Sequence, residues 1–438
     1  MPHTLRDVLP VTATVNDRDH LDIGGCDTTE LAATFGTPLY VFCEETFRTR
    51  AQELRGAFPD AGLYFAAKAC PALAVLQLAA SLGLGIDVAS AGELHAALAA
   101  GVDPEGLILH GNNKGDADIV RAVEAGVGRI ALDNLDDVVR VAAAARHAGH
   151  RQRVVLRVTP GVEAHTHTYI QTGQEDSKFG LSIEAGLAMA AVEQADALDS
   201  LELVGIHAHI GSNIFSYDPF GKTVEILFEF LADVEKVLGP KLGEVNLGGG
   251  FGIPYVAGDY PLRLDLLAKL IGETASQEAA RHAMEVPRLS FEPGRFLVGN
   301  AMVTLYTVGV VKEIPGVRTF VSVDGGMSDN IRPALYQARY AAILANKARH
   351  EAARTVTVAG MHCESGDILV HDAALPASVE RGDIIAVPAT GAYGYSMASN
   401  YNRQPRPAVV LVRDGSPHVI VRRETLDDLL RLEVGLPE

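Results

Sequence analysis

The sequence predicts an α/β barrel joined to a second domain that is mostly β-strand. Between about residue 60 and residue 295, short β-prone runs alternate with longer Ala- and Leu-rich stretches of helical character, which is typical of βα units around a parallel sheet. After residue 296 the pattern changes to alternating, Val-rich runs separated by Gly, Pro and Asp, as expected of a β domain. The 438 residues also exceed the usual length of one domain.

Eight apolar runs in the first region are the strand candidates. The first four start about 22 residues apart, which leaves room for one strand, one helix and two tight loops in each unit. Eight such units predict a (β/α)8 barrel of the TIM type over residues 36–295. In chain order the runs are LYFAA (63–67), GIDV (85–88), LILH (107–110), RIAL (129–132), VVLRV (154–158), LVGIHAHI (203–210), VNL (245–247) and LSFE (289–292).

The remaining residues, 1–35 and 296–438, are expected to form the β-rich domain. The N-terminal part contains no βα unit, so the barrel would be inserted between the two halves of that domain. One polar segment, residues 159–180, breaks the rhythm of the barrel and is about as long as a whole βα unit. Loops of that length in compact domains are usually functional.

Composition and charge exclude several classes of protein. The formal net charge of −18 argues against nucleic-acid and anionic-membrane partners, because both need clustered Lys and Arg. The four cysteines, at positions 26, 43, 70 and 363, are widely spaced and form no C-x-x-C pair, which argues against a disulfide framework and a structural zinc site. The first residues show no signal-peptide pattern, and no run of about 18 apolar residues occurs. We therefore expect a cytoplasmic protein.

Barrel enzymes place their sites where the strands end, and three candidates there are a lysine and two histidines. Lys68 directly follows LYFAA, so its amine is expected in a poorly hydrated mouth, where a lowered pKa would allow it to form a Schiff base. A lysine on the barrel rim with its ammonium in water is the alternative. His207 and His209 would share one face of a strand. They could bind a metal, although no third ligand is evident from spacing, be buried core residues, or stack on an aromatic cofactor.

Two further barrel segments carry candidate groups. The glycines of LGGGFG (247–252) would let backbone N–H groups approach an anion, although a permissive turn is the alternative. Neither the P-loop nor the complete dinucleotide fingerprint is present. In FEPGR, Glu292 could hold a proton on a heterocyclic nitrogen and Arg295 could grip a carboxylate or phosphate, although a local ion pair is the alternative.

The β-rich domain carries three polar and aromatic clusters within otherwise regular strand patterns. DNIRPALY contains Arg332 and Tyr336, HCESGD contains Cys363 and Glu364, and GAYGYSMASNYN contains Tyr393. A lone cysteine is most often a small buried hydrophobe. No single one of these three clusters therefore indicates a function, and they are interpreted together.

Six segments in order, YFAAKA, HAHIGS, LGGGFG, FEPGR, CESGD and GAYGYSMASNYN, resemble the fold-type III pyridoxal-phosphate-dependent decarboxylases. The resemblance covers nearly the whole chain, and the order and spacing of the six are highly specific. The 159–180 segment and GNNK (111–114) resemble the diaminopimelate branch of that family. Two residues depart from the pattern, Phe251 where Leu is common and Asn213 where Gln is common. These two changes concern only the fine shape of the site.

The resemblance implies an alanine-racemase-like pair of domains with pyridoxal 5'-phosphate as the cofactor. It also implies a homodimer in which the CESGD segment of one subunit completes the site of the other, so that Cys363 and Glu364 come from the partner. A small amino acid would be the substrate, and no metal is implied. The competing interpretations are a decarboxylase of carboxynorspermidine or another diamino acid, a barrel that only carries the cofactor, and a metal-dependent hydrolase built on His207 and His209.

The resemblance assigns a role to each candidate residue. Lys68 would hold the cofactor as a Schiff base, and Cys363 would donate a proton after carbon dioxide leaves, with Lys68 as the alternative donor. His209 would stack on the cofactor ring and Glu292 would pair with the pyridine nitrogen. The other cofactor contacts would come from Gly249, Gly250, Gly294, Arg295 and Tyr393. The substrate contacts would come from Arg295, Arg332, Tyr336, Glu364 and Tyr393.

Charge counting then favours one substrate within the family. Diaminopimelate carries both an ammonium and a carboxylate at its far end, whereas a simple diamino acid carries only the ammonium. Glu364 matches the ammonium, and Arg295 with Arg332 matches the carboxylate, because burying arginines without an anionic partner is costly. The expected reaction is the decarboxylation of meso-2,6-diaminopimelate to L-lysine and carbon dioxide, the last step of lysine biosynthesis.

Overall fold

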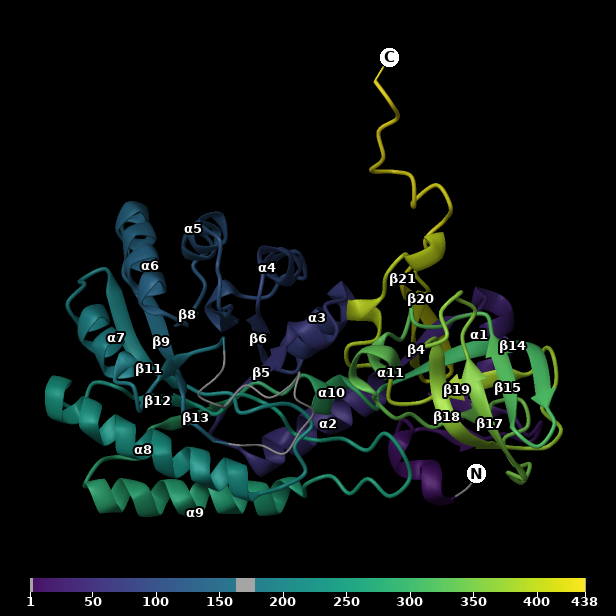
Figure 1. Ribbon diagram of the computed structural model, residues 1–438. Coiled ribbons are helices and arrows are strands. Elements are labelled where there is room, and N and C mark those ends of the chain that lie inside the picture. Colours follow the sequence, from purple (N-terminus) through teal and green to yellow (C-terminus); the bar gives the residue numbers. More distant parts are fainter. Residues whose placement is uncertain (1–2, 163–177, 438) are drawn as a thin grey trace. The chain divides into compact units, whose positions relative to one another are not determined.

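The computed structural model describes residues 3–162 and 178–437, whose elements are shown in Figure 1. Most of the polar 159–180 segment, residues 163–177, lies outside the described residues. The chain divides into two compact units. The barrel unit comprises Ala51–Gly252 and Pro261–Phe296. The β-rich unit comprises the described residues up to Arg50, Ile253–Tyr260 and the described residues from Leu297 on.

The barrel unit contains the predicted ring of parallel strands. Its neighbouring strands follow the order β9-β11-β12-β13-β5-β6-β7-β8, and β8 also pairs with β9, which closes the barrel. The short β10 (Leu181–Ser182) lies beside β9. The predicted eight-stranded barrel is therefore confirmed within the described residues. The strands are β5 (Gly62–Ala66), β6 (Gly85–Val88), β7 (Leu107–Leu109), β8 (Arg129–Leu132), β9 (Gln152–Thr159), β11 (Leu201–His207), β12 (Glu244–Asn246) and β13 (Arg288–Phe291).

Helices follow the barrel strands along the chain, and two of them, α4 and α6, begin at capping side chains. Ser90 accepts a hydrogen bond from the backbone N–H of Glu93, and Asn134 accepts one from Asp137, which satisfies donors that a helix start leaves unpaired. Strands such as β5 and β7 are buried on both faces, so they appear in the sequence as continuous apolar runs. The helices are α3 (Leu73–Ser81), α4 (Ala91–Ala99), α5 (Asp116–Glu124), α6 (Leu135–Ala148), α7 (Leu187–Asp196), α8 (Asp218–Leu238) and α9 (Leu264–His282).

The β-rich unit is built on a mixed sheet, as the alternating Val-rich runs predict. Its main path is β18-β17-β15-β14-β4-β20-β21, and β19 pairs with β14 and with β16. A small three-stranded sheet and helix α1 (Thr28–Phe35) come from the N-terminal residues, and helix α2 (Glu44–Ala57) follows β4. The strands are β1 (Thr14–Val15), β2 (Leu21–Ile23), β3 (Cys26–Asp27), β4 (Leu39–Cys43), β14 (Met302–Ile314), β15 (Arg318–Val323), β16 (Ile343–Leu344), β17 (Arg354–Ala359), β18 (Ile368–Leu375), β19 (Ile384–Val387), β20 (Ala408–Arg413) and β21 (Ser416–Val421).

The division into units differs from the sequence-based boundaries 36–295 at two places. Strand β4 pairs antiparallel with β14 and parallel with β20, so the residues around it belong to the β-rich unit. Residues Leu39 and Val41 share one buried cluster with Val303 and Val410. Residues Ile253–Tyr260 also join this unit. Both differences arise from contacts between segments far apart in the chain, as in the ring contact of Tyr255 with Tyr340.

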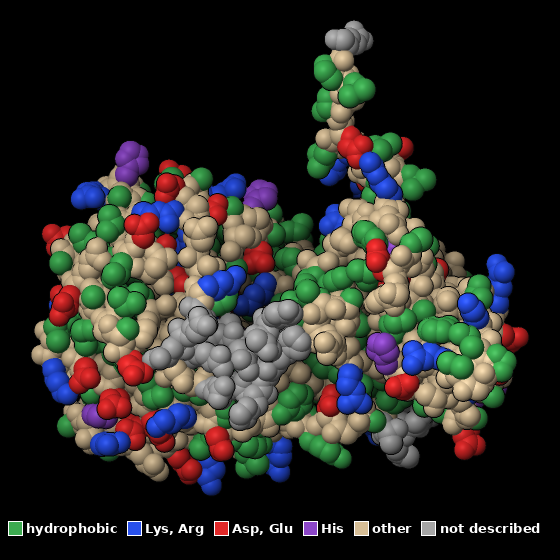
Figure 2. Space-filling view, in the orientation of Figure 1, with side chains coloured by type: hydrophobic (Ala, Val, Ile, Leu, Met, Phe, Trp, Pro, Cys, Tyr) green, Lys and Arg blue, Asp and Glu red, His purple; other side chains and the backbone are tan. Residues whose placement is uncertain are grey.

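The surface carries charges of both signs. On the face of the barrel unit that Figure 2 shows, Lys and Arg side chains alternate with Asp and Glu. Among the described helices, none is long and apolar enough to cross a membrane. Cys26, Cys43 and Cys70 are buried free thiols, whereas Cys363 is exposed.

Candidate active site

A buried carboxylate, Glu292, gathers three side chains at the ends of barrel strands. Its Oε1 accepts hydrogen bonds from His110 Nε2 at 3.0 Å and from Asn246 Nδ2 at 2.7 Å. Its Oε2 accepts one from His207 Nε2 at 3.0 Å. Glu292 follows β13, His110 follows β7, His207 ends β11 and Asn246 ends β12. Because parallel strands end at the same edge, four segments distant in sequence meet here.

The two neighbouring histidines keep Glu292 ionised in spite of its burial. Burial alone would raise the pKa of this carboxyl, but His110 and His207 outweigh it and hold the pKa well below its usual range. Burial also lowers the pKa of His207 to about 4. At neutral pH, His207 is therefore an uncharged donor to a negatively charged Glu292.

The same three residues could form a metal site, which sequence spacing did not reveal. The ligand atoms of His110, His207 and Glu292 lie within 4.8 Å of one another. However, Nδ1 of His207 is buried without a hydrogen-bond partner among the described residues, whereas metal-binding histidines normally donate their other N–H to an acceptor. The observed arrangement is better explained as a carboxylate held by two N–H donors.

His209 lies off the strand, which corrects the expected pairing with His207. Strand β11 ends at His207, so the two rings do not share a strand face. His209 Nδ1 accepts the backbone N–H of Gly249 at 3.3 Å, which places the ring proton on Nε2. The pKa of His209 is lowered, first by burial and then by the positive charges of Lys68 and Arg157. The imidazole is therefore neutral at physiological pH.

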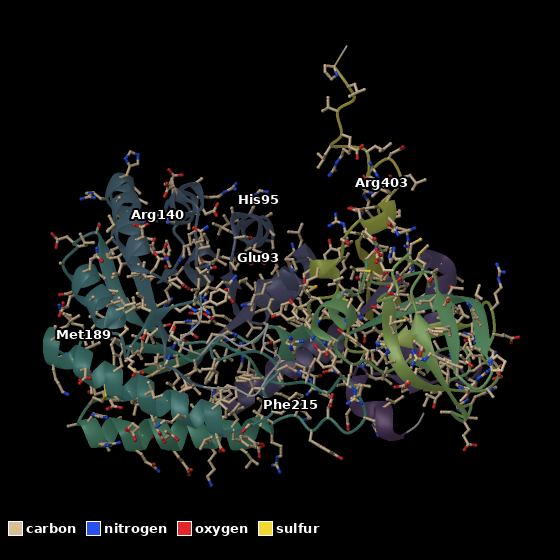
Figure 3. The ribbon with its side chains drawn as sticks, viewed as in Figure 1. Glu93, His95, Arg140, Met189, Phe215 and Arg403 are labelled. Atoms are coloured by element: carbon tan, nitrogen blue, oxygen red, sulfur yellow. The ribbon has the colours of Figure 1, made fainter. Side chains whose placement is uncertain are left out.

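Lys68 lies on a short 3-10 turn, Ala67–Ala69, immediately after β5. Its side chain is exposed, so the expected poorly hydrated surroundings are not found: the turn carries the lysine beyond the buried strand. Its positive charge acts on His209, on buried Asp87 and on Glu93 of helix α4, which Figure 3 labels. Asp87 Oδ1 is buried without a hydrogen-bond partner among the described residues.

Glycines bring three backbone segments unusually close together beside Lys68. A Cβ on Gly249 would lie 2.5 Å from Glu292 O, and one on Gly250, whose φ is +95°, would lie 2.5 Å from Gly211 O. A Cβ on Gly294 would lie 2.9 Å from that of Ala69. Only glycine fits at these close approaches. The HIGS, GGG and EPGR segments therefore form one backbone cradle.

Arg295 brings positive charge to this cradle. It begins the short helix α10 (Arg295–Val298), is 5% exposed, and donates to Ser212 Oγ from Nε at 3.3 Å and from Nη2 at 3.1 Å. Phe251, which departs from the family pattern, is buried and packs against the rings of Phe58 and Phe291. The larger side chain is thus part of the core that supports the glycine loop.

Arg157 is a further mouth residue that sequence reasoning missed. It is buried on β9, with Nη1 3.4 Å from Asp133 Oδ2 and its guanidinium 4.6 Å from the centre of the Phe179 ring. Asp133 Oδ1 also accepts the backbone N–H of Gly180 at 2.8 Å. Like Asp87, His110 and Asn246, it is a polar residue that interrupts or ends an apolar run. That position was the signal that could have identified all four.

The GNNK string has a structural anchor. Lys114 Nζ lies 2.6 Å from Asp137 Oδ2, and both side chains are buried. Asp137 belongs to helix α6, as does Arg140, which is labelled in Figure 3. Arg140 Nη1 lies 3.7 Å from Asp137 Oδ1, and Arg140 Nε lies 2.7 Å from Asp116 Oδ1 of helix α5. The lysine thus holds the loop after β7 to the start of helix α6.

The other predicted site residues lie in the β-rich unit. Arg332 begins helix α11 (Arg332–Tyr336), is 5% exposed, donates to Tyr340 Oη and lies 4.9 Å from the centre of the Tyr255 ring. Tyr336 ends that helix and is half-buried. Tyr255 explains why Ile253–Tyr260 belongs with this unit.

Cys363, Glu364 and Tyr393 also lie in the β-rich unit. Cys363 and Glu364 are exposed, and Glu364 accepts a hydrogen bond from Tyr401 Oη. Tyr393 is half-buried and has φ of +62°. The structure thus gathers Lys68, His209, Gly249, Gly250, Glu292, Gly294 and Arg295 at the mouth of the barrel. It places Arg332, Tyr336, Cys363, Glu364 and Tyr393 in the other unit.

Comparisons with known proteins identify the family of this chain. The family model "Pyridoxal-dependent decarboxylase, pyridoxal binding domain" matches residues 44–299. The chain is 49% identical over 429 residues to the diaminopimelate decarboxylase of Halalkalibacterium halodurans, covering 97% of this chain and 98% of that one. It is 47% identical to the Bacillus subtilis enzyme of that name, covering 97% of each. The crystal structure of the M. jannaschii diaminopimelate decarboxylase in co-complex with L-lysine has a TM-score of 0.90 at 35% identity, covering 97% of this chain and 98% of that one.

The barrel mouth fits pyridoxal phosphate by the chemistry of its groups. The exposed Lys68 suits the aldehyde of the cofactor, and the buried, ionised Glu292 suits its ring nitrogen. The glycine cradle beside Arg295 suits its phosphate. The cofactor is pyridoxal phosphate, and the enzyme is a pyridoxal-phosphate-dependent decarboxylase. With relatives this similar over nearly the whole of both chains, this chain belongs to the diaminopimelate decarboxylase family.

Proposed function

We propose that this enzyme removes the carboxylate from meso-2,6-diaminopimelate and releases L-lysine and carbon dioxide, as the last step of lysine biosynthesis. The observation that carries this proposal is the 49% identity over 429 residues to a diaminopimelate decarboxylase. The co-complex of the M. jannaschii enzyme with L-lysine, which is the product expected here, supports it further.

The barrel residues would hold and tune the cofactor. Bound pyridoxal phosphate supplies a sink for the electrons of the carbon–carboxylate bond. Lys68 offers its exposed amine to hold the cofactor covalently. Glu292 would keep a proton on the pyridine nitrogen, because it is ionised, buried and held by three donors. His209 contributes a neutral ring that confines the cofactor without removing its proton.

The cradle would bind the phosphate side. Gly249, Gly250 and Gly294 allow the backbone to approach closely, and Arg295 adds a positive charge held by Ser212. Tyr393 of the β-rich unit is the other expected contact. A phosphate requires such convergent donors, because its charge is costly to remove from water.

The β-rich unit would select the substrate. Arg332 and Tyr336, together with Arg295, would bind the far carboxylate, and Glu364 would bind the far ammonium. Arg332 suits this task because two tyrosine rings fix its guanidinium plane, which favours bidentate binding of a carboxylate. Cys363 would deliver the proton to the α-carbon, because its thiol is exposed beside Glu364. Lys68 remains the alternative donor.

We also infer a homodimer in which Cys363 and Glu364 serve the partner's site. The support is an unusual apolar segment near the C-terminus: Leu430, Leu432, Val434 and Leu436 are 55%, 86%, 95% and 96% exposed. They lie in turns and irregular backbone after β21, where no other part of the described chain covers them. A second copy would remove them from water. Sedimentation of the intact chain should give twice the mass of one chain, and deletion of residues 429–438 should weaken the association. The expected cytoplasmic location stays a prediction.

One experiment tests the proposed reaction. The purified holoenzyme should show the visible absorbance of lysine-bound cofactor and should form L-lysine from meso-diaminopimelate. Parallel assays with L-lysine, L-ornithine and carboxynorspermidine as substrates would detect a different diamino-acid decarboxylase. Lys68→Ala should lose both the absorbance and the activity. Failure of the wild-type holoenzyme to form lysine would overturn the proposal.

A further inference from the structure

Two loops of the β-rich unit carry the residues assigned to the substrate. Residues 325–330 lead into helix α11 and Arg332, and residues 360–367 contain Cys363 and Glu364. Cys363 and Glu364 are exposed. Reactive groups on loops need fixed backbones, because a displacement of about 1 Å can cost roughly 100-fold in rate.

A buried carboxylate, Asp367, joins these two loops. It is 3% exposed. Its Oδ1 accepts the backbone N–H of Met327 at 2.6 Å, and its Oδ2 accepts the backbone N–H of His362 at 2.8 Å. One oxygen thus binds each loop, in hydrogen bonds that the negative charge strengthens.

Two glycines make room for this carboxylate. A Cβ on Gly326 would lie 2.6 Å from both oxygens of Asp367, and a Cβ on Gly360 would lie 2.1 Å from Oδ2. At these distances, a side chain at either position would force the carboxylate of Asp367 to move. The backbones also meet directly, because the N–H of Met361 donates to Gly325 O at 2.9 Å.

His362 provides a second connection between the loops. Its Nδ1 faces Asn402 Nδ2 at 3.3 Å and therefore accepts, which leaves the proton on Nε2. Nε2 then donates to Ser328 Oγ at 2.9 Å. The ring is 8% exposed, although the next two residues in the chain are exposed. The loop is thus held at its base while Cys363 and Glu364 remain accessible.

We propose that Asp367, assisted by His362, is a positioning residue that fixes the loop of Cys363 and Glu364, which serves the partner's site, against the segment carrying Arg332, which serves the subunit's own site. The inference rests on the proposed function, since that function assigns the substrate contacts to both loops. Beyond that function, we infer that the positions of the two substrate-binding loops depend on the buried carboxylate of Asp367, which itself contacts no substrate.

Asp367→Asn in the holoenzyme is the principal test. The amide retains one acceptor oxygen, but its NH2 group would face a backbone N–H, so one of the two loops is released. We expect kcat/KM for meso-diaminopimelate to fall about 100-fold, while the visible absorbance of the cofactor is retained. Asp372→Asn, an exposed position on the adjacent strand β18, is the matched control and should behave as wild type.

The reactivity of Cys363 gives a readout that does not depend on turnover. The other three cysteines are buried, so the rate of maleimide labelling of the folded holoenzyme reports mainly on this thiol. Asp367→Asn should change that rate several-fold, and Asp372→Asn should not. If the wild type forms no lysine, the proposed function fails, yet labelling still tests the loop connection.

A second pair of variants covers the case in which Asp367→Asn does not fold. His362→Gln can still donate to Ser328, whereas His362→Ala cannot. We expect His362→Ala to lower kcat/KM and alter labelling, and His362→Gln to restore much of both. Wild-type kcat/KM and labelling in Asp367→Asn, or in His362→Ala, would overturn the proposal.

Discussion

Replacing Glu292 by Gln should impair catalysis far more than folding. The carboxylate accepts three hydrogen bonds, two at Oε1 and one at Oε2. The amide oxygen can retain the donors on one side, but the amide NH2 would then face the Nε2–H of His207. One hydrogen bond to a charged group is lost, which costs about 1.5–3 kcal/mol.

A tautomer change of His207 does not avoid this cost. Moving its proton to Nδ1 would place a donor where the described residues offer no partner, which costs about 1–3 kcal/mol. Both outcomes leave a folded barrel. The catalytic loss is larger, because a neutral amide cannot hold the pyridine proton, and removal of one such electrostatic contact costs about 100- to 1,000-fold in kcat.

The assay compares Glu292→Gln with Glu285→Gln, an exposed position just before β13 that undergoes the same change of charge. Both proteins should retain the visible absorbance of the cofactor, since Lys68 is intact. Only Glu292→Gln should lose kcat, with a small fall in the thermal midpoint. A kcat within fivefold of wild type would refute the assigned role of the carboxylate.

Three further predictions follow from single sites. Burial lowers the pKa of His207 to about 4, so the folded chain binds fewer protons than the unfolded one between that value and 6.5. Stability should therefore fall by about 3 kcal/mol as the pH decreases through this window, and thermal unfolding of His207→Gln should lack that component. Gly250→Ala should weaken cofactor binding measured by dialysis, since its Cβ would lie 2.5 Å from Gly211 O, whereas Gly272→Ala in open space should not. Arg332→Ala should raise KM for meso-diaminopimelate at least tenfold, roughly the loss of one charged hydrogen bond, with the cofactor absorbance unchanged.

The barrel could be predicted from sequence because its strands are buried on both faces. Runs such as LILH and RIAL are continuously apolar, and each became a strand. The run LYVFC at β4 is equally apolar, but it pairs with β14 and β20. Nothing local distinguishes a barrel strand from this one, because the difference lies in which distant segment pairs with it.

The sequence predicted those site residues that directly follow a barrel strand. Lys68 and Glu292 each lie within two residues of a strand end, so their place at the barrel mouth follows from the fold. The partners of Glu292 do not follow from it. His110 and His207 come from β7 and β11, which are not neighbours of β13, and such contacts across the barrel depend on the directions of the side chains. The expectation that His209 shares a strand face with His207 was wrong, because strand β11 ends at His207.

The β-rich unit shows why motifs on loops are harder to interpret. A barrel strand fixes the residue that follows it through its hydrogen bonds to two neighbours, whereas a loop must be held by side chains. In this unit, Asp367 and His362 hold the loop of Cys363, and two tyrosine rings hold Arg332. These buried polar groups lie next to the groups assigned to the substrate. Their substitution should therefore alter substrate preference through geometry while the charges that recognise the substrate remain in place.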